Sequence, residues 1–287
     1  MQHIVETFFE SATSTFSYVV HTGQGSPCAV IDSVLSYTAN SGKTNTDAAD
    51  KIIAFIQQME LNVEWILETH IHADHLSAAT YIKSKVGGRI AVSQQVTKVI
   101  HTFAALFNLT DTAEALTAQF DYLFDEDETF RIGPILCTAL YSPGHTPADL
   151  AYIVGEKMIF VGDTLFMPDV GTARCDFPGG SAETLYASIR RILTYSDDTQ
   201  LMMCHDYPPA TRTHQSVTTI AEQRKHNIHI NDKVDQAAFI HARNSRDKIL
   251  DSPQLLFPSV QINIRAGEFP KAESNGRQYL KIPLNFL

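Results

Sequence analysis

Apolar residues along this chain occur in two patterns, short continuous runs and residues three or four positions apart, and segments of the two kinds alternate. Short apolar runs predict strands at Ser14–Val20, Cys28–Val34, Val63–Glu68, Arg89–Val92, Ile135–Tyr141, Ala151–Val154, Met158–Val161 and around Leu201–Met203. Apolar residues three and four positions apart predict helices at Asp47–Glu60, Leu76–Lys85, Gln94–Phe107, Ser181–Tyr195, Val217–His226 and Asp232–Ile249. The remaining segment, Leu255–Leu287, is rich in proline and is expected to be irregular. Strands that alternate with helices predict an α/β fold.

A segment rich in histidine follows the apolar run Val63–Glu68. It reads THIHADH from residue 69 and carries His70, His72, Asp74 and His75. Imidazole and carboxylate are ligands that zinc and iron prefer. In an extended chain His70 and His72 lie on the same side. The alternative interpretation is a surface turn, but residues further along the chain favour a metal site.

Three further predicted strands end in residues of the same chemistry. His145 follows the run Ile135–Tyr141, Asp163 follows Met158–Val161, and His205 ends the run that begins near Leu201. A single histidine at a strand end is usually structural, and a Gly-Asp-Thr segment is usually a turn. Four strand ends that all carry metal-ligand residues indicate one shared site.

Composition indicates a globular enzyme and excludes several other classes. The chain has 287 residues, 44% hydrophobic and 19% charged, so disorder is not expected. The net charge of −10 argues against a nucleic-acid surface. No segment resembles a signal peptide or a membrane span. The four cysteines, two of which (Cys175 and Cys204) we interpret as buried core residues, form no CxxC pair and predict reduced thiols in the cytoplasm.

The ordered set His-x-His-x-Asp-His, Gly-His, Gly-Asp and His resembles the signature of the metallo-β-lactamase superfamily. Within it, residues 69–75, 142–146, 161–166, 171–177 and 203–207 are similar to the persulfide (sulfur) dioxygenases. Residues 257–265 and 279–285 resemble the bacterial branch of these enzymes. The resemblance implies a four-layer αββα sandwich with a helical and irregular C-terminal extension. We expect one domain over residues 1–287, with residues 215–287 packed on it as the extension.

The resemblance also implies a ligand set. In persulfide dioxygenases one Fe(II) per chain binds a facial triad, which corresponds here to His70, His145 and Asp163 as metal-binding and catalytic residues. The other members of the cluster would then orient these ligands through hydrogen bonds; they are His72, Asp74, His75 and His205. In binuclear relatives the same residues bind two metals, with Asp163 between them. The sequence contains the ligands for both occupancies and does not choose between them.

The activity implied by the resemblance is oxidation of glutathione persulfide by O₂ and water to sulfite and glutathione, in sulfide catabolism. No Gly-rich nucleotide motif suggests an organic cofactor. Glutathione carries two carboxylates, which arginine binds well, so the expected substrate contacts are Arg174, Arg224, Arg265 and Tyr207. Coenzyme A or another small thiol stays open as the sulfur carrier. The homodimer that we expect follows from the family alone.

Two other functions are alternatives to the dioxygenase. The first is a binuclear glutathione thioesterase similar to glyoxalase II, in which a metal-bound hydroxide attacks the thioester. Glyoxalase II enzymes carry Gly-Gly soon after the Asp-His pair, whereas here Leu76-Ser77-Ala78-Ala79 follows His75. The second is a non-catalytic protein that responds to metals or thiols. The complete ligand set argues against it, because a binder would be free to lose ligands.

Overall fold

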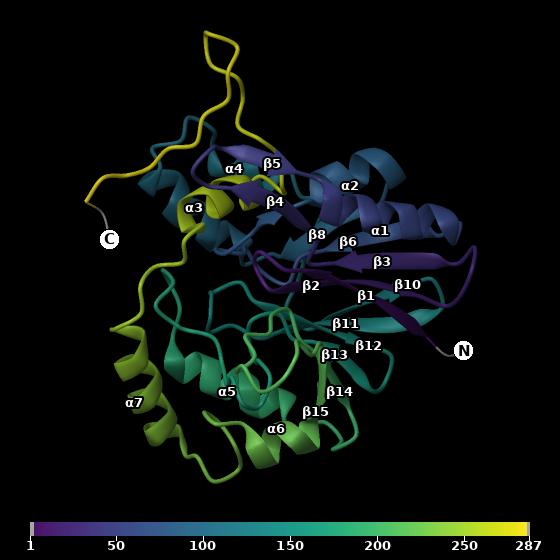
Figure 1. Cartoon of the computed structure of the whole chain (residues 1–287), viewed down its shortest axis with the longest axis vertical. Coiled ribbons are helices and arrows are strands. Elements are labelled where there is room, and N and C mark those ends of the chain that lie inside the picture. The colour runs from purple at the N-terminus through teal and green to yellow at the C-terminus, as the bar shows by residue number, and fades with distance from the viewer. Residues whose placement is uncertain (1–2, 286–287) are drawn as a thin grey trace.

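The structure, a computed structural model, describes residues 3–285 and is built around two large sheets that lie face to face (Figure 1). The first sheet has the spatial order β1 (Ile4–Glu10), β2 (Thr15–His21), β3 (Pro27–Ile31), β6 (Asn62–Leu67), β8 (Arg89–Ser93) and β9 (Tyr122–Phe124). The second has the order β10 (Glu128–Ile132), β11 (Ile135–Tyr141), β12 (Leu150–Val154), β13 (Met158–Phe160), β14 (Gln200–Met202) and β15 (Val217–Thr219). A small third sheet joins β5 (Lys43–Asn45), β4 (Val34–Thr38) and β7 (Leu76–Ser77).

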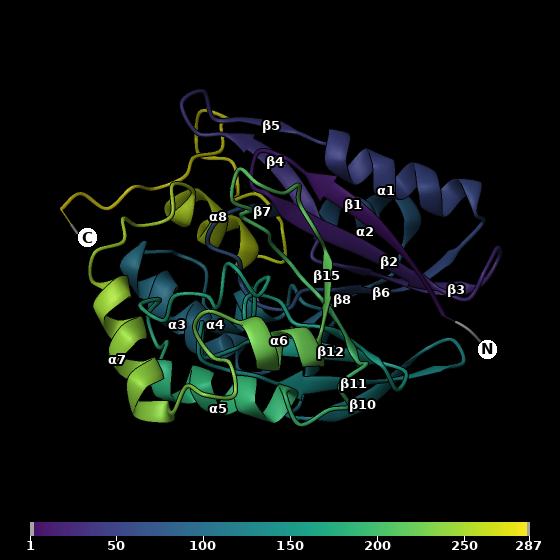
Figure 2. The same ribbon diagram turned by 60° about the horizontal axis from the view of Figure 1, so that its bottom comes forward.

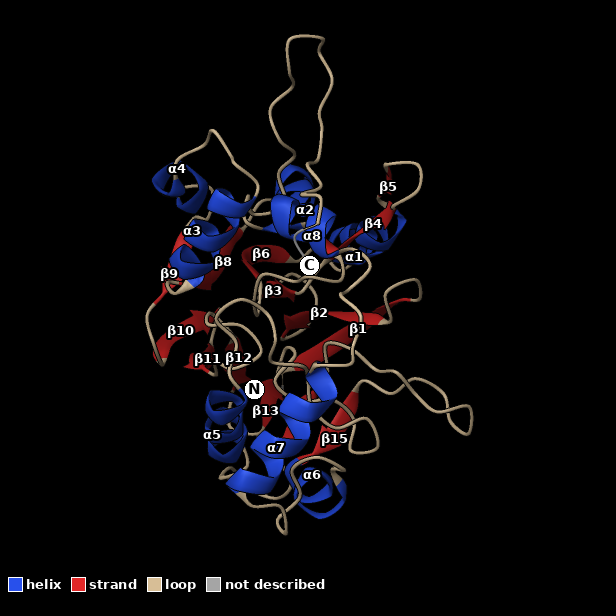
Figure 3. Cartoon of the chain, turned by 90° about the vertical axis from the view of Figure 1, so that its left-hand side faces the viewer, coloured by secondary structure: helices blue, strands red, loops and turns tan. Residues whose placement is uncertain are grey.

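Helices cover the outer faces of both large sheets, with the strands between them (Figure 3). The helices beside the first sheet are α1 (Asp47–Gln58), α2 (Ala79–Val86), α3 (Val96–Leu106) and α4 (Ala113–Thr117). Those beside the second sheet are α5 (Ala182–Ile192), α6 (Ile220–His226) and α7 (Gln236–Asp247). Figure 2 shows α8 (Leu256–Asn263) on the side of the first sheet, near β7. The predicted four-layer αββα sandwich is confirmed.

Three apolar clusters hold the four layers together. The stripe on α1 that includes Ile52 and Ile56 packs against the first sheet. Tyr152 belongs to the cluster between the two sheets, and Leu185 and Ile189 of α5 pack against the second sheet. Because helices cover the outer faces of the sheets, inner strands such as β3 and β12 are apolar and buried on both faces, whereas the edge strands β1 and β10 are partly exposed.

The topology brings the ends of several strands to one place. β6 lies between β3 and β8 and is parallel to both, so the three carboxyl ends share one edge of the first sheet. In the second sheet β13 and β14 are also parallel. The backbone N–H of Phe16 donates to the Cys204 carbonyl at 2.7 Å, and Thr15 pairs with His205 in an isolated bridge. These contacts connect the two sheets at the end where the predicted ligands lie.

Several predicted boundaries were wrong. Leu76 does not begin a helix, because Leu76 and Ser77 pair with β4 and the helix starts at Ala79. Val217–Thr219 forms a strand that pairs with β14, and α6 begins only where the Thr219 hydroxyl caps it. The segment after Leu255, expected to be irregular, includes helix α8, which packs against β7. Among residues 3–285 no helix is long and apolar enough to cross a membrane.

Gly144 lies in the turn before His145, where the backbone packs closely against α5. Its φ is +146°, and a Cβ there would lie 2.3 Å from the Leu185 Cα. We predict that Gly144→Ala lowers the free energy of unfolding by about 1–3 kcal/mol, because backbone on α5 cannot move aside cheaply. Gly42→Ala is the control: its φ is +63°, but no atom lies within 4 Å of the added Cβ, so only roughly 1 kcal/mol of backbone strain is expected. Chemical denaturation that gives equal losses for the two variants would contradict this view of the turn.

Candidate metal centre

The histidine-rich segment forms a loop directly after the buried strand β6. His70, His72 and His75 are at most 1% exposed, and Asp74 is more open, with 27% of its side chain exposed. Short loops after β11, β13 and β14 place His145, Asp163 and His205 against it. Both large sheets therefore contribute to one cluster of seven side chains.

Asp163 lies at the middle of this cluster. Its Oδ2 atom is 3.9 Å from the His70 Nε2 and 3.7 Å from the His145 Nε2. Its Oδ1 atom is 3.5 Å from the His205 Nε2, which is itself 3.1 Å from the Asp74 Oδ2. The Asp163 carboxylate thus faces the two histidines of the predicted triad with one oxygen and faces His205 with the other. The structure brings together all seven residues that the sequence singled out.

Several of the polar atoms that converge here have no hydrogen-bond partner. They are the Nε2 atoms of His70, His75 and His205, the Nδ1 atom of His72 and the Oδ1 atom of Asp163. A buried polar atom without a partner costs on the order of 1–3 kcal/mol, so five of them in one place need an explanation. A cation that accepts their lone pairs satisfies all of them at once. Imidazole nitrogen and carboxylate oxygen fit zinc or iron.

The opposite nitrogen of each ring is held by the protein. The His72 Nε2 lies 3.1 Å from Asp32 and 3.3 Å from Glu68, both buried carboxylates. The His145 Nδ1 lies 2.8 Å from the Arg174 carbonyl, and the Nδ1 of His205 lies 3.3 Å from the Thr15 hydroxyl. Hydrogen bonds of this kind fix ring orientation and the proton position of metal-binding histidines. The free nitrogens are therefore pointed into the cluster before any ion binds.

Burial lowers the pKa of two of the metal-facing imidazoles, His75 and His70, and so keeps these two rings neutral. It is the main cause that lowers the pKa of His75 to about 3, and the neighbouring His72 lowers it further. Burial also holds the pKa of His70 well below its usual range, assisted by His72 and His145. A neutral imidazole has a free lone pair, so these rings can bind a metal near neutral pH without first losing a proton.

The C-terminal helix α8 holds the loop from the other side. The Asn263 amide donates to the carbonyls of His72 and His75, each at 2.8 Å, and its oxygen accepts from the Ser77 backbone N–H at 2.8 Å. Asn263 is 3% exposed, so these three hydrogen bonds are shielded from water. The residue has no ligand chemistry of its own, which is why sequence reasoning missed it.

A cavity of about 1080 Å³ opens onto one side of the cluster. Asp74, His145 and Asp163 form its inner wall. Three arginines, Arg174, Arg243 and Arg246, also line it. The cavity thus joins the metal-facing atoms to a cationic region, which suits an anionic substrate.

The predicted substrate contacts divide into two groups. Arg174 and Tyr207 line the cavity; the Arg174 guanidinium also pairs with Asp176, and the Tyr207 ring stacks on His205. Arg224 and Arg265 do not line it, and the structure corrects both predictions. Arg224 pairs with Asp197 and Asp232 on the far side of α6, and Arg265 is buried against Asp111.

Two cationic residues at the cavity escaped the sequence analysis. Arg243 and Arg246 stand one turn apart on α7, a helix with no recognisable motif. The Arg243 guanidinium is committed to Asp247, whereas Arg246 makes no ion pair within the described part of the chain, residues 3–285. The only signal for them is the basic pair three residues apart on a helix.

Comparison with known proteins agrees with the fold and the cluster. Residues 11–205 match the metallo-β-lactamase superfamily, and the chain belongs to this family of metalloenzymes. It is 50% identical over 284 residues to "Glyoxylase B2" of Dictyostelium discoideum, covering 99% of this chain and 97% of that protein. It is 48% identical to a probable metallo-hydrolase of Burkholderia pseudomallei (strain 1710b), with 98% and 99% covered.

Two further comparisons concern persulfide dioxygenases. The chain is 25% identical to the human mitochondrial persulfide dioxygenase ETHE1, covering 92% of this chain and 89% of that one. The crystal structure of ETHE1 from Myxococcus xanthus matches with a TM-score of 0.73 at 25% identity, covering 92% of this chain and all of that one.

The Asn263 contacts can be tested by substitution. We predict that Asn263→Ala lowers the free energy of unfolding by roughly 2 kcal/mol, because three buried backbone groups lose their partner. Metal affinity, measured by chelator competition, should fall as the loop loosens. Asn244→Ala, at an exposed position on α7, should change neither quantity. Unaltered metal affinity in Asn263→Ala would show that α8 does not support the loop.

The lowered pKa of His75 predicts how the metal-free protein responds to acid. Between pH 6.5 and about 3 the unfolded chain carries a proton on His75 that the folded chain does not. Stability therefore falls as the pH drops through this range. Urea unfolding of the metal-free protein at pH 7 and pH 5 should show this loss, and His75→Gln should reduce it. The variant is needed because burial raises the pKa of Asp149 to about 6, which acts in the opposite direction. The same pH dependence in both proteins would refute the prediction.

Proposed function

We propose that this chain is an iron-dependent persulfide dioxygenase that oxidises glutathione persulfide to sulfite. The observation that carries the proposal is the group His70, His145 and Asp163, whose donor atoms lie within 4.8 Å of one another. Two of the three also line the cavity, so a substrate in it reaches their open side. When bound by two histidines and one carboxylate on one face, iron(II) supplies open positions and redox chemistry for O₂.

The persulfide dioxygenases resemble this chain beyond the segment that matches the superfamily, as do the two relatives of higher identity. The human enzyme and the Myxococcus xanthus structure each align with 92% of it, beyond the 11–205 segment that defines the superfamily. The alignment therefore extends into the part that holds α7 and α8. These helices supply Arg246 at the cavity and Asn263 behind the loop.

The reaction balances without a further cofactor. Glutathione persulfide, O₂ and water give glutathione and sulfurous acid, which ionises to sulfite. The outer sulfur gives up four electrons, and O₂ takes up four. The two carboxylates of glutathione would face the cationic side of the cavity, at Arg174 and Arg246. Tyr207 is placed to add a hydroxyl contact.

A binuclear glutathione thioesterase is the second candidate. It is favoured by the free atoms on His72, His75 and His205, which lie outside the triad and complete a second set of ligands. The names of the relatives at 50% and 48% identity, a glyoxylase and a metallo-hydrolase, point the same way. These residues and Asp163 would hold a second metal ion, and such a pair of ions would supply an activated water for thioester hydrolysis.

One assay separates the two candidates. The full-length protein is loaded anaerobically with Fe(II), and its metal content is determined on the same sample. We expect O₂ uptake with glutathione persulfide, one sulfite formed per O₂, and no cleavage of a glutathione thioester. Thioester cleavage without O₂ uptake would reject the dioxygenase and favour the hydrolase.

The triad assignment predicts the effect of removing each ligand. His70→Ala, His145→Ala and Asp163→Ala should each lose iron binding and activity, because two remaining ligands hold iron(II) weakly. His241→Ala, exposed on α7 away from the cavity, is the control and should keep both. Iron content by atomic absorption is the measurement. Normal iron content in all three variants would show that these residues are not the iron ligands.

The cationic side of the cavity predicts a change in substrate affinity. Arg174→Ala and Arg246→Ala should each raise KM for glutathione persulfide about ten-fold, since a charge-assisted hydrogen bond contributes roughly 1.5 kcal/mol. The value of kcat should change little. Arg224→Ala provides the matched control, because this arginine lies away from the cavity. Equal KM values for all three variants and the wild type would place the substrate elsewhere.

A further inference from the structure

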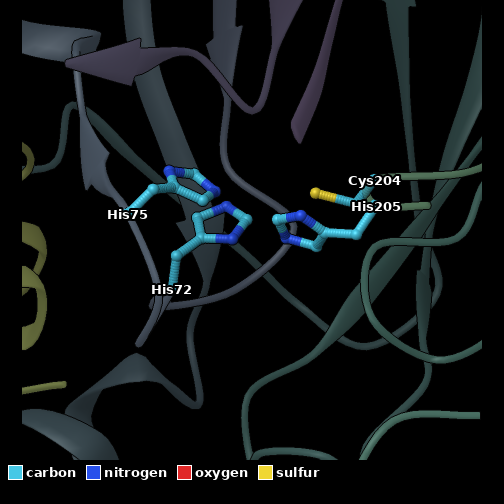
Figure 4. A group of neighbouring side chains, drawn as sticks. All are labelled: His72, His75, Cys204 and His205. Carbon is cyan, nitrogen blue, oxygen red and sulfur yellow. The ribbon is translucent and has the colours of Figure 1, made fainter. Parts of the chain in front are cut away.

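One histidine that lies outside the metal cluster also faces the cavity. Figure 4 shows three histidines of the cluster itself, all of them buried. His229 is different, because it follows α6 in the chain, is only partly buried and lines the cavity. Among residues 3–285 it belongs to no group of side chains whose donor atoms could hold a metal. Its place in the cavity wall therefore calls for another role.

The His229 ring is fixed by the backbone segment on which it packs. Its Nδ1 atom accepts a hydrogen bond from the Thr172 backbone N–H at 3.0 Å. Gly171 allows this approach, because a Cβ at that position would lie only 2.1 Å from the Nδ1 atom. The backbone of His229 is held as well, since its N–H donates to the Asn227 Oδ1 at 2.8 Å. The ring is therefore oriented before a substrate enters the cavity.

The hydrogen bond from Thr172 decides where the ring carries its proton. A nitrogen that accepts from a backbone N–H needs a free lone pair, so the proton of the neutral ring lies on Nε2. Burial, assisted by the charges of Arg243 and Arg246, lowers the pKa of His229 to about 4, so the ring is neutral near pH 7. Within residues 3–285 the ring makes its hydrogen bonds through Nδ1, which leaves the Nε2–H free to donate.

The cavity wall thus places an uncharged donor beside charged ones. Guanidinium groups such as that of Arg246 bind carboxylates most strongly, because both partners are charged. A neutral N–H adds no charge and suits an uncharged oxygen, such as the carbonyl of a peptide group. Glutathione contains both kinds of acceptor, two carboxylates and two peptide carbonyls.

We propose that His229 is a substrate-binding residue whose Nε2–H donates to a peptide carbonyl of the glutathione moiety. This rests on the part of the proposed function that the two candidate enzymes share, a glutathione-linked substrate. It does not depend on whether O₂ or water reacts at the metal. The residue would distinguish peptide thiols from smaller thiols, such as cysteine, that have no peptide carbonyl.

Calorimetric titration of full-length, zinc-loaded protein with S-methylglutathione tests the contact, because this probe has no free thiol to bind the metal. We expect His229→Phe to weaken binding about five-fold to ten-fold, the loss that follows from one neutral hydrogen bond. His229→Gln keeps a donor and an acceptor and should stay within about two-fold of the wild type. His241→Phe, at an exposed position on α7, is the control and should bind as the wild type does. Zinc content should be the same in all four proteins.

Wild-type affinity in His229→Phe would overturn the proposal, as would a wild type that does not bind S-methylglutathione. If His229→Phe does not fold, nitrogen NMR of the wild type with labelled histidine decides. The His229 ring, assigned by the signal missing in His229→Gln, should carry its proton on Nε2, and the Nε2 signal should shift when S-methylglutathione is added. A proton on Nδ1, or an Nε2 signal that does not move at saturation, rejects the contact. Neither readout uses O₂, so failure of the dioxygenase activity alone leaves this test unchanged.

Discussion

The constraint that shapes this fold is a cluster of buried polar atoms that find no hydrogen-bond partner among the described residues of the protein. Five nitrogen and oxygen atoms of the cluster are buried at the seam between the two sheets and lack hydrogen-bond partners. Each would destabilise the folded chain in the absence of a ligand. The rings keep their orientation in the folded chain because their opposite nitrogens contact carboxylates, hydroxyls and carbonyls of the protein. A metal ion then converts an unfavourable cluster into a stabilising one.

Both halves of the sandwich are needed to build this site. The β6 loop presents one group of side chains, and the loops after β11, β13 and β14 present the other. The C-terminal helix α8 closes the arrangement from behind, where Asn263 holds the loop backbone. α7 lines the cavity in front with Arg243 and Arg246. Residues beyond the segment that matches the superfamily, 11–205, therefore shape both the back of the metal loop and the cavity mouth.

Sequence reasoning predicted the residues that carry chemistry better than those that support them. Histidines and carboxylates at the ends of apolar runs are visible as a pattern, and the structure brings all seven together. Arg224 and Arg265 were misplaced because the sequence does not show on which side of the fold a basic residue lies, and neither of them lines the cavity. Asn263 and Arg246 were missed because they reach the site from distant helices.

We infer that the histidine and aspartate atoms without hydrogen-bond partners hold a metal ion. Anomalous diffraction from crystals of iron-loaded protein, recorded on both sides of the iron absorption edge, shows whether they do. We expect an iron peak about 2.0–2.2 Å from the Nε2 atoms of His70 and His145 and from an Asp163 carboxylate oxygen. Crystals of iron-loaded protein with no peak at this position, and with water hydrogen-bonded to these atoms instead, would contradict it.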